Sequence, residues 1–117
     1  MSEEVQKQRE EVDESLLLVS GSKGDKGNNK EYVKKLANAI TQVFSKHSKA
    51  TLRCVGAASL NNAIKAFIIA KDEAKRREEF FVIDPSFTTV NFNGDEKTGI
   101  ILEVILHKCL DEEVKSD

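Results

Sequence analysis

The stretch that decides the fold is ATLRCVGAASLNNAIKAFIIA, residues 50–70. Its first six residues alternate between apolar and polar side chains, which is typical of a strand with one buried face. Gly56 ends the alternation, and apolar residues then recur at the three- and four-residue spacing of a helix. Because Ala66, Ile69 and Ala70 add apolar positions outside a single stripe, this helix is expected to bury a second surface against another element or a partner subunit.

A similar strand and helix precede this stretch. The continuous apolar run LLLV at residues 16–19 predicts a strand buried on both faces. Residues 21–28 are rich in glycine and lysine, which favours an open loop. From Tyr32 to Phe44 apolar residues recur on one stripe, which predicts a helix over about residues 29–47 that Asn28 or Asn29 caps.

Two strands follow the stretch. The run FFVI at residues 80–83 predicts a third strand, and the Asp-Pro pair after it marks an irregular end or an edge of the sheet. An extended continuation over residues 88–92 is an open alternative. The Asn-Gly pair at 93–94 predicts a turn, and alternation over residues 100–107 predicts a long last strand. The order β-α-β-α-β-β predicts an α/β two-layer sandwich with both helices on one face of a mixed four-stranded sheet.

The charges of the 117 residues are unevenly distributed. Residues 1–14 carry six acids and two bases, and residues 111–117 carry four acids and one base. Residues 15–110 therefore have a net charge of +5, although the whole chain has a net charge of −2. We expect a single domain over residues 15–110 between an acidic, disordered N-terminal tail (1–14) and an acidic C-terminal tail (111–117).

The sequence shows no sign of secretion or membrane insertion. The first 15 residues contain no apolar segment of the kind found in signal peptides. The longest strongly apolar run, Ala66–Ala70, is far shorter than the roughly 20 residues that cross a bilayer. Cys54 and Cys109 lie in apolar segments and are expected to be reduced thiols. These features predict a cytoplasmic protein without membrane contact, associated with the nucleoid or nuclear according to its source.

The common catalytic motifs are missing. The glycine-rich loop lacks the Gly-Lys-Ser/Thr ending of a P-loop, and no G-x-G-x-x-G follows the first strand. His107 and Cys109, with Cys54 or His47, form at most a weak zinc pattern, and a half-exposed histidine and packed thiols are the favoured interpretation. No nucleophile, base and orienting group share a spacing that brings them together. We therefore expect no enzymatic activity, no metal and no cofactor.

Polar residues follow each of the first two predicted strands. The first group lies in the glycine loop and at the helix that it enters, where free backbone N–H groups also favour phosphate oxygens. The second group lies on the first turns of the second helix. Each group alone is equally consistent with an ordinary solvated surface, but adjacent parallel strands would bring both to the same sheet edge. The candidate phosphate-binding residues are Lys23, Lys26, Lys30, Asn61, Asn62 and Lys65.

Two segments resemble the stage V sporulation protein S family: GAASLNNAIKAFIIA, residues 56–70, and PSFTTVNFNGDEKTGIILEV, residues 85–104. The first shares a glycine-alanine start, a Leu-Asn dipeptide and an Ala-Ile-Lys-Ala helix with that family. The second shares a Pro-x-Phe-Thr, an Asn-Gly-Asp-Glu-Lys-Thr turn and a final apolar strand. The opening Leu-Val-Ser at residues 18–20 is also similar, so the resemblance covers about residues 16–106.

This resemblance implies an Alba-like fold, dimerisation and nucleic-acid binding, since the family is related in fold to the Alba chromatin proteins. Alba proteins contact phosphates through lysines after the first strand, arginines at the second strand-helix turn and a basic hairpin. Lys23 and Lys26 match the first set by their loop. Ala57 and Asn62 stand near the arginine positions, and the hairpin tip carries two acids beside one lysine. These departures imply weak, salt-sensitive or partner-assisted binding.

Our leading hypothesis is a non-enzymatic nucleic-acid-binding regulator, acting on DNA or RNA as a homodimer or higher homo-oligomer through the extra apolar face of the second helix and the last strands. The bacterial family is known as a regulator of sporulation development. The alternative is a protein-protein interaction module that kept the fold and lost nucleic-acid binding. A third hypothesis, a small-molecule or enzymatic site at the same sheet edge, predicts a deep pocket near Gly21 and Gly56.

Overall fold

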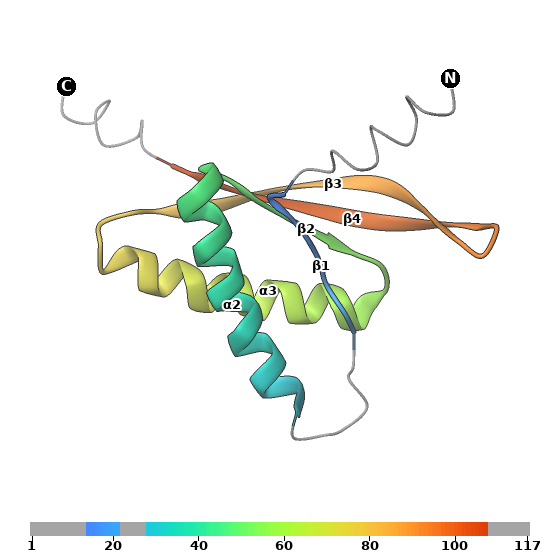
Figure 1. The fold of residues 1–117 in the computed structure, drawn as a ribbon, viewed down its shortest axis with the longest axis horizontal. Helices are drawn as coiled ribbons and strands as arrows, with labels where there is room; N and C mark the ends of the chain where they lie inside the picture. The colour runs from blue at the N-terminus through green and yellow to red at the C-terminus, as the bar shows by residue number, and fades with distance from the viewer. Residues whose placement is uncertain (1–13, 22–27, 108–117) are drawn as a thin grey trace.

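The computed structural model describes residues 14–21 and 28–107, and its elements follow the predicted order (Figure 1). They are β1 (Leu16–Leu18), α2 (Asn28–His47), β2 (Ala50–Cys54), α3 (Ala57–Lys75), β3 (Phe81–Phe92) and β4 (Asp95–Leu106). The four strands form one sheet in the order β1-β2-β4-β3. β1 and β2 are parallel, whereas β4 runs antiparallel to β2 and β3. Both helices lie against the same face of this mixed sheet, which confirms the predicted two-layer α/β sandwich.

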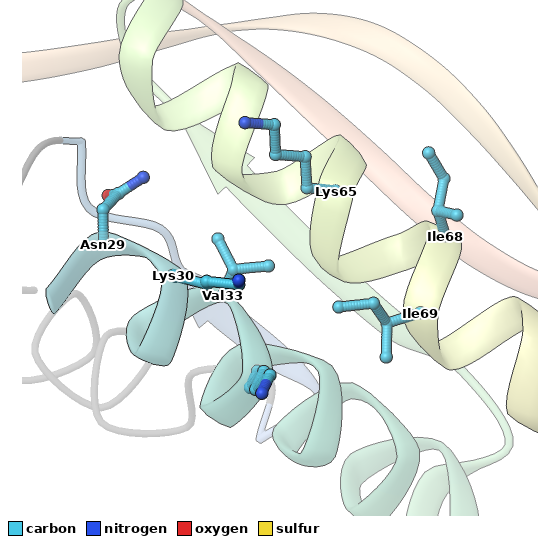
Figure 2. Close-up of a pocket in the computed structure, with 7 residues that line it drawn as sticks. Asn29, Lys30, Val33, Lys65, Ile68 and Ile69 are labelled. Carbon is cyan, nitrogen blue, oxygen red and sulfur yellow. The ribbon is translucent and has the colours of Figure 1, made fainter. Parts of the chain in front are cut away.

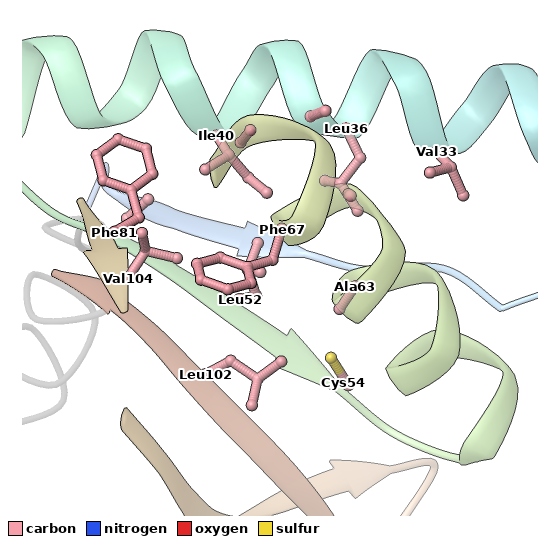
Figure 3. Close-up of a cluster of buried hydrophobic side chains, with 14 of the residues drawn as sticks. Val33, Leu36, Ile40, Leu52, Cys54, Ala63, Phe67, Phe81, Leu102 and Val104 are labelled. Atoms are coloured by element: carbon pink, nitrogen blue, oxygen red, sulfur yellow. The ribbon is translucent and has the colours of Figure 1, made fainter. Parts of the chain in front are cut away.

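The core lies between that face and the two helices (Figure 3). In β2, Ala50, Leu52 and Cys54 are buried and the residues between them are partly exposed, as the alternation in the sequence predicts. The rings of Phe44 and Phe81 add a tilted aromatic contact, with centroids 4.6 Å apart. The buried cluster consists of Val33, Leu36, Ala37, Ile40, Ala50, Leu52, Cys54, Ala63, Ala66, Phe67, Ala70, Ala74, Phe81, Leu102 and Val104.

A residue with left-handed backbone geometry follows each helix. Ser48 follows α2 with a φ of 62°, and Glu78 follows α3 with a φ of 61°. The Glu78 N–H donates to the Lys75 carbonyl (2.9 Å), and the Glu79 N–H donates to the Ala74 carbonyl (3.0 Å). This pair of hydrogen bonds is the Schellman motif, in which glycine is the usual left-handed residue. Glu78 therefore adopts a backbone conformation that is unfavourable for a residue with a Cβ.

β3 and β4 form a hairpin that is longer than the predicted strands, because all twelve residues of β3 pair with β4. The predicted turn is confirmed: Asn93 and Gly94 have φ angles of 51° and 85°. β3 passes through Pro85 without interruption, so the continuation over residues 88–92 is observed. The tip of the hairpin extends past the helical layer (Figure 1).

Pro85 fits within β3 because this strand is at the edge of the sheet. The His107 N–H donates to the Phe80 carbonyl at 2.7 Å, which identifies this pair as hydrogen-bonded. Since hydrogen-bonded and non-hydrogen-bonded pairs alternate in an antiparallel ladder, the nitrogen of Pro85 points away from β4. The missing donor therefore removes no bond from the ladder.

Candidate functional site

The junctions that follow β1 and β2 meet at one edge of the sheet. β1 and β2 are parallel, and the Val19 N–H extends their pairing by donating to the Arg53 carbonyl at 3.0 Å. A Cβ on Gly21 would lie 3.1 Å from the Cβ of Ala58, so the chain leaving β1 packs against the first turn of α3. Gly56, with a φ of 96°, makes the sharp turn from β2 into α3. This arrangement confirms the predicted adjacency of the two junctions.

Asn62 links three parts of this edge. Its side chain is 2% exposed, and its Nδ2 donates to the carbonyls of Ser20 (3.0 Å) and Gly21 (3.1 Å). The amides of Asn62 and Asn29 also bond each other: Asn29 Nδ2 donates to Asn62 Oδ1 at 3.1 Å, and Asn62 Nδ2 donates to Asn29 Oδ1 at 3.2 Å. One buried amide thus holds the end of β1, the first turn of α2 and the first turns of α3 together.

The role of Asn62 therefore differs from the phosphate contact expected from its position in the sequence. Its amide faces protein acceptors and is shielded from solvent. A polar residue on the first turns of a helix can face either solvent or the preceding loop, and the sequence pattern did not distinguish these two orientations. We assign Asn62 a positioning role and leave it out of the direct phosphate contacts proposed below.

The other predicted residues divide into three groups. Lys23 and Lys26 lie outside the described residues. Lys30 on α2 and Lys65 on α3 are exposed, and both line one groove between the two helices. Asn61 is exposed on α3 but does not line this groove.

The groove between α2 and α3 has a volume of about 570 Å³ (Figure 2). Its apolar floor combines the buried side chain of Val33, the half-buried Ile69 and the 45% exposed Ile68. Three exposed lysines and one asparagine complete the lining. In full, the residues are Asn29, Lys30, Val33, Lys34, Lys65, Ile68 and Ile69.

Lys34 also lines the groove, although it is not among the phosphate-binding residues predicted from the sequence. It follows Lys30 by four positions, so both side chains lie on the same face of α2. That spacing is visible in the sequence. The position of this face opposite Lys65 depends on how α2 and α3 pack, which the spacing does not determine.

The lysines of the groove take no part in the ion pairs of the described residues. Within residues 14–21 and 28–107, no carboxylate forms an ion pair with Lys30, Lys34 or Lys65. The ion pairs on α3 and its C-terminal turn join Lys71 to Asp72 (3.3 Å) and Arg77 to Glu79 (3.4 Å). The groove therefore combines three exposed lysines outside these ion pairs with an apolar floor, which favours an anionic ligand.

Possible metal ligands are dispersed in the part of the chain that the structure describes, where no three His, Cys, Asp or Glu side chains come together. Burial raises the pKa of the Cys54 thiol to about 11. The thiol is therefore protonated near neutral pH and is neither a nucleophile nor a ready metal ligand. Cys109, the other predicted partner of His107, lies outside the described residues.

Large apolar side chains are exposed on the strands. Phe87 on β3 is 81% exposed and pairs with Ile100, which places it on the helix-covered face of the sheet but beyond the cover of α3. Leu18, on the other edge strand, is 61% exposed. No helix in the part of the chain that the structure describes is both long and apolar enough to cross a membrane.

The comparison with protein families matches the region that contains the groove. The family model of stage V sporulation protein S matches residues 27–107. The match spans α2 to β4 and includes the lining of the groove and the long hairpin. It agrees with the resemblance noted in residues 56–70 and 85–104. The chain therefore belongs to the stage V sporulation protein S family.

Proposed function

We propose that this protein is a non-enzymatic regulator that binds the phosphate backbone of nucleic acid at the groove between α2 and α3. The observation that carries the proposal is the group of three exposed lysines, Lys30, Lys34 and Lys65, on two helices around one groove without an acidic partner among the described residues. Lysine ammonium groups bind phosphates by releasing condensed counterions, which gives affinity without sequence preference.

Three further features support this proposal. Residues 15–110 carry a net charge of +5, which suits a polyanionic partner. The groove lies at the first turns of α2, directly after the glycine loop with Lys23 and Lys26, which we propose as additional phosphate contacts together with Asn61. The stage V sporulation protein S family is related in fold to the Alba chromatin proteins, which implies the same class of ligand.

A salt titration tests the proposal. The full chain is titrated with fluorescent duplex DNA and single-stranded RNA at several salt concentrations. Five lysine contacts, three in the groove and two in the glycine loop, predict that log K falls with log salt at a slope of about −4.5 for the duplex and about −3.5 for the single strand. If neither the duplex nor the single strand binds at low salt, the proposal is contradicted.

A matched pair of variants locates the site. Lys30→Gln with Lys65→Gln removes two charges from the groove and should make the slope less steep by about 1 to 2 units. Lys46→Gln with Lys75→Gln removes the same charge from the last turns of the same helices. Equal effects of the two pairs would show that binding depends on net charge alone.

We also propose that the protein acts as a homo-oligomer whose contact surface includes the edge strand β3. An aromatic side chain as exposed as Phe87 is typical of a contact surface. A second copy can cover Phe87 across the free edge of β3, next to the outward-facing nitrogen of Pro85. Phe87→Ser should lower the molar mass measured by light scattering, whereas Leu18→Ser, on the opposite edge, should leave it unchanged. An unchanged mass for both variants contradicts this contact.

The exposed Phe87 also favours the second candidate function, a protein-interaction module. The two functions differ in what the groove lysines do. If the module binds a specific protein partner, capture of that partner from a lysate should survive Lys30→Gln with Lys65→Gln and fail with Phe87→Ser.

A further inference from the structure

We infer that the groove between α2 and α3 selects single-stranded nucleic acid over a duplex, with phosphates at its lysines and a base against its apolar floor. This inference rests on the proposed function, because the same lysines hold the phosphates in both. It adds the class of nucleic acid, which the basic charge of the domain does not determine.

The floor of the groove is the first reason. A site for phosphate alone needs only cations and hydrogen-bond donors. Here Val33, Ile68 and Ile69 line the same groove as the lysines, and Ile68 remains 45% exposed. Covering this apolar surface is favourable by about 25 cal/mol per Å², and a phosphate group cannot supply the apolar contact. The ligand that fits best carries anionic and flat, weakly polar groups on one backbone.

The shape of the groove is the second reason. A duplex keeps its bases paired and stacked inside a convex surface, so it would touch the lysines and leave the floor uncovered. A single strand can turn a base out of its stack, and proteins hold such bases between aromatic or apolar side chains. The groove volume of about 570 Å³ lies within the range of roughly 300–1,000 Å³ typical of ligand sites.

The arrangement of the charges is the third reason. Lys30 and Lys34 lie four residues apart on α2, which is about 6 Å along the helix axis, and Lys65 lies on the opposite wall. The strand can therefore run along the groove with cations on both sides. The paired amides of Asn29 and Asn62 fix the first turn of α2 against α3 and so maintain the separation of these walls before any ligand binds.

The first experiment separates base contact from phosphate contact. Fluorescence anisotropy measures binding of the full chain to three ligands with equal numbers of phosphates: a single strand, the same strand without bases, and a duplex. We expect the single strand with bases to bind at least threefold more tightly than the other two. Equal affinity for the strands with and without bases overturns the inference and leaves the proposed function standing. Failure of all three ligands at low salt overturns the proposed function itself.

The second experiment locates the base. Ile68→Ala shortens an exposed side chain of the floor and should weaken binding of the strand with bases by about threefold to tenfold. The salt slope and the affinity for the abasic strand should stay unchanged, because no charge is removed. Ile105→Ala, at a 37% exposed isoleucine on β4 outside the groove, is the matched control. Circular dichroism and light scattering verify that both variants keep the fold and the molar mass.

Two further outcomes overturn the inference. Equal effects of Ile68→Ala and Ile105→Ala on the strand with bases overturn the placement of the base in the groove. An acidic peptide that displaces the abasic and the base-containing strand equally well would identify the groove as a charged docking site for protein, which also overturns the inference.

Discussion

Among single residues, the buried Asn62 is expected to contribute more to the stability of the fold than its exposed neighbour Asn61. Asn62→Leu keeps the branching of the side chain, although it is bulkier, and leaves the Ser20 and Gly21 carbonyls and the Asn29 amide without their partner. We expect the free energy of unfolding to fall by about 2 kcal/mol in urea denaturation. Asn61→Leu alters an exposed position and should change it by less than about 0.5 kcal/mol. Equal stability of the two variants would show that the amide contacts contribute nothing.

The burial of Cys54 makes the stability of the fold depend on pH above about 9. The pKa of its thiol is raised from 9.0 to about 11 by desolvation, so the unfolded chain loses this proton at a lower pH than the folded chain. The contribution of this protonated thiol to the free energy of unfolding is therefore complete below pH 9 and decreases as the pH rises from 9 towards 11. In a Cys109→Ser background, a thiol reagent at pH 8 should label Cys54 only after urea unfolding. Rapid labelling of the folded protein contradicts the burial of this thiol.

At the scale of the elements, the C-terminal end of α3 is held by hydrogen bonds that Glu78 completes in an unfavourable backbone conformation. Glu78→Gly removes the contact between Cβ and the following carbonyl and should raise the free energy of unfolding by about 0.5–1 kcal/mol in urea denaturation. Glu79→Gly, at the next position, should lower it, because glycine gains flexibility in the unfolded chain. A destabilising Glu78→Gly would contradict the left-handed geometry.

The elements also show which parts of the fold the sequence predicts well. The alternation in residues 50–55 and the helical stripe from Tyr32 to Phe44 are local patterns, so both predicted elements match the structure closely. The hairpin is less predictable. Pro85 suggests an end or an edge, and only the order of the strands shows that β3 can pass through it at the edge of the sheet.

The candidate site also combines residues that local sequence patterns predict with residues that only the packing of the helices brings together. The sequence placed Lys30 and Lys65 at one sheet edge because two parallel strands require it. It did not identify Lys34 or the apolar floor, since these depend on how α2 crosses α3. The two helices contribute buried small residues such as Ala37, Ala63 and Ala66 to the core, and these residues carry no mark of a binding site in the sequence. The site therefore became visible only with the packing of the helices.

The charge of the whole chain leads to the last prediction. The net charge of −2 combines a basic domain with acidic segments at residues 1–14 and 111–117, which lie mostly outside the described residues. We propose that these acidic segments compete with nucleic acid for the groove lysines. Replacing Glu3, Glu4, Glu10 and Glu11 by glutamine in the full chain should therefore tighten binding of a single strand a few-fold at low salt.

The gain should disappear as salt shortens the range of the charges, to about 3 Å at 1 M. Replacing Ser2, Gln6 and Gln8 by alanine alters the same segment without changing its charge and serves as the control. Both variants are compared with the parent chain by fluorescence anisotropy across the salt series. Unchanged binding of the glutamine variant at low salt would show that the acidic segment stays away from the groove, and the net charge of the chain would then say nothing about its affinity.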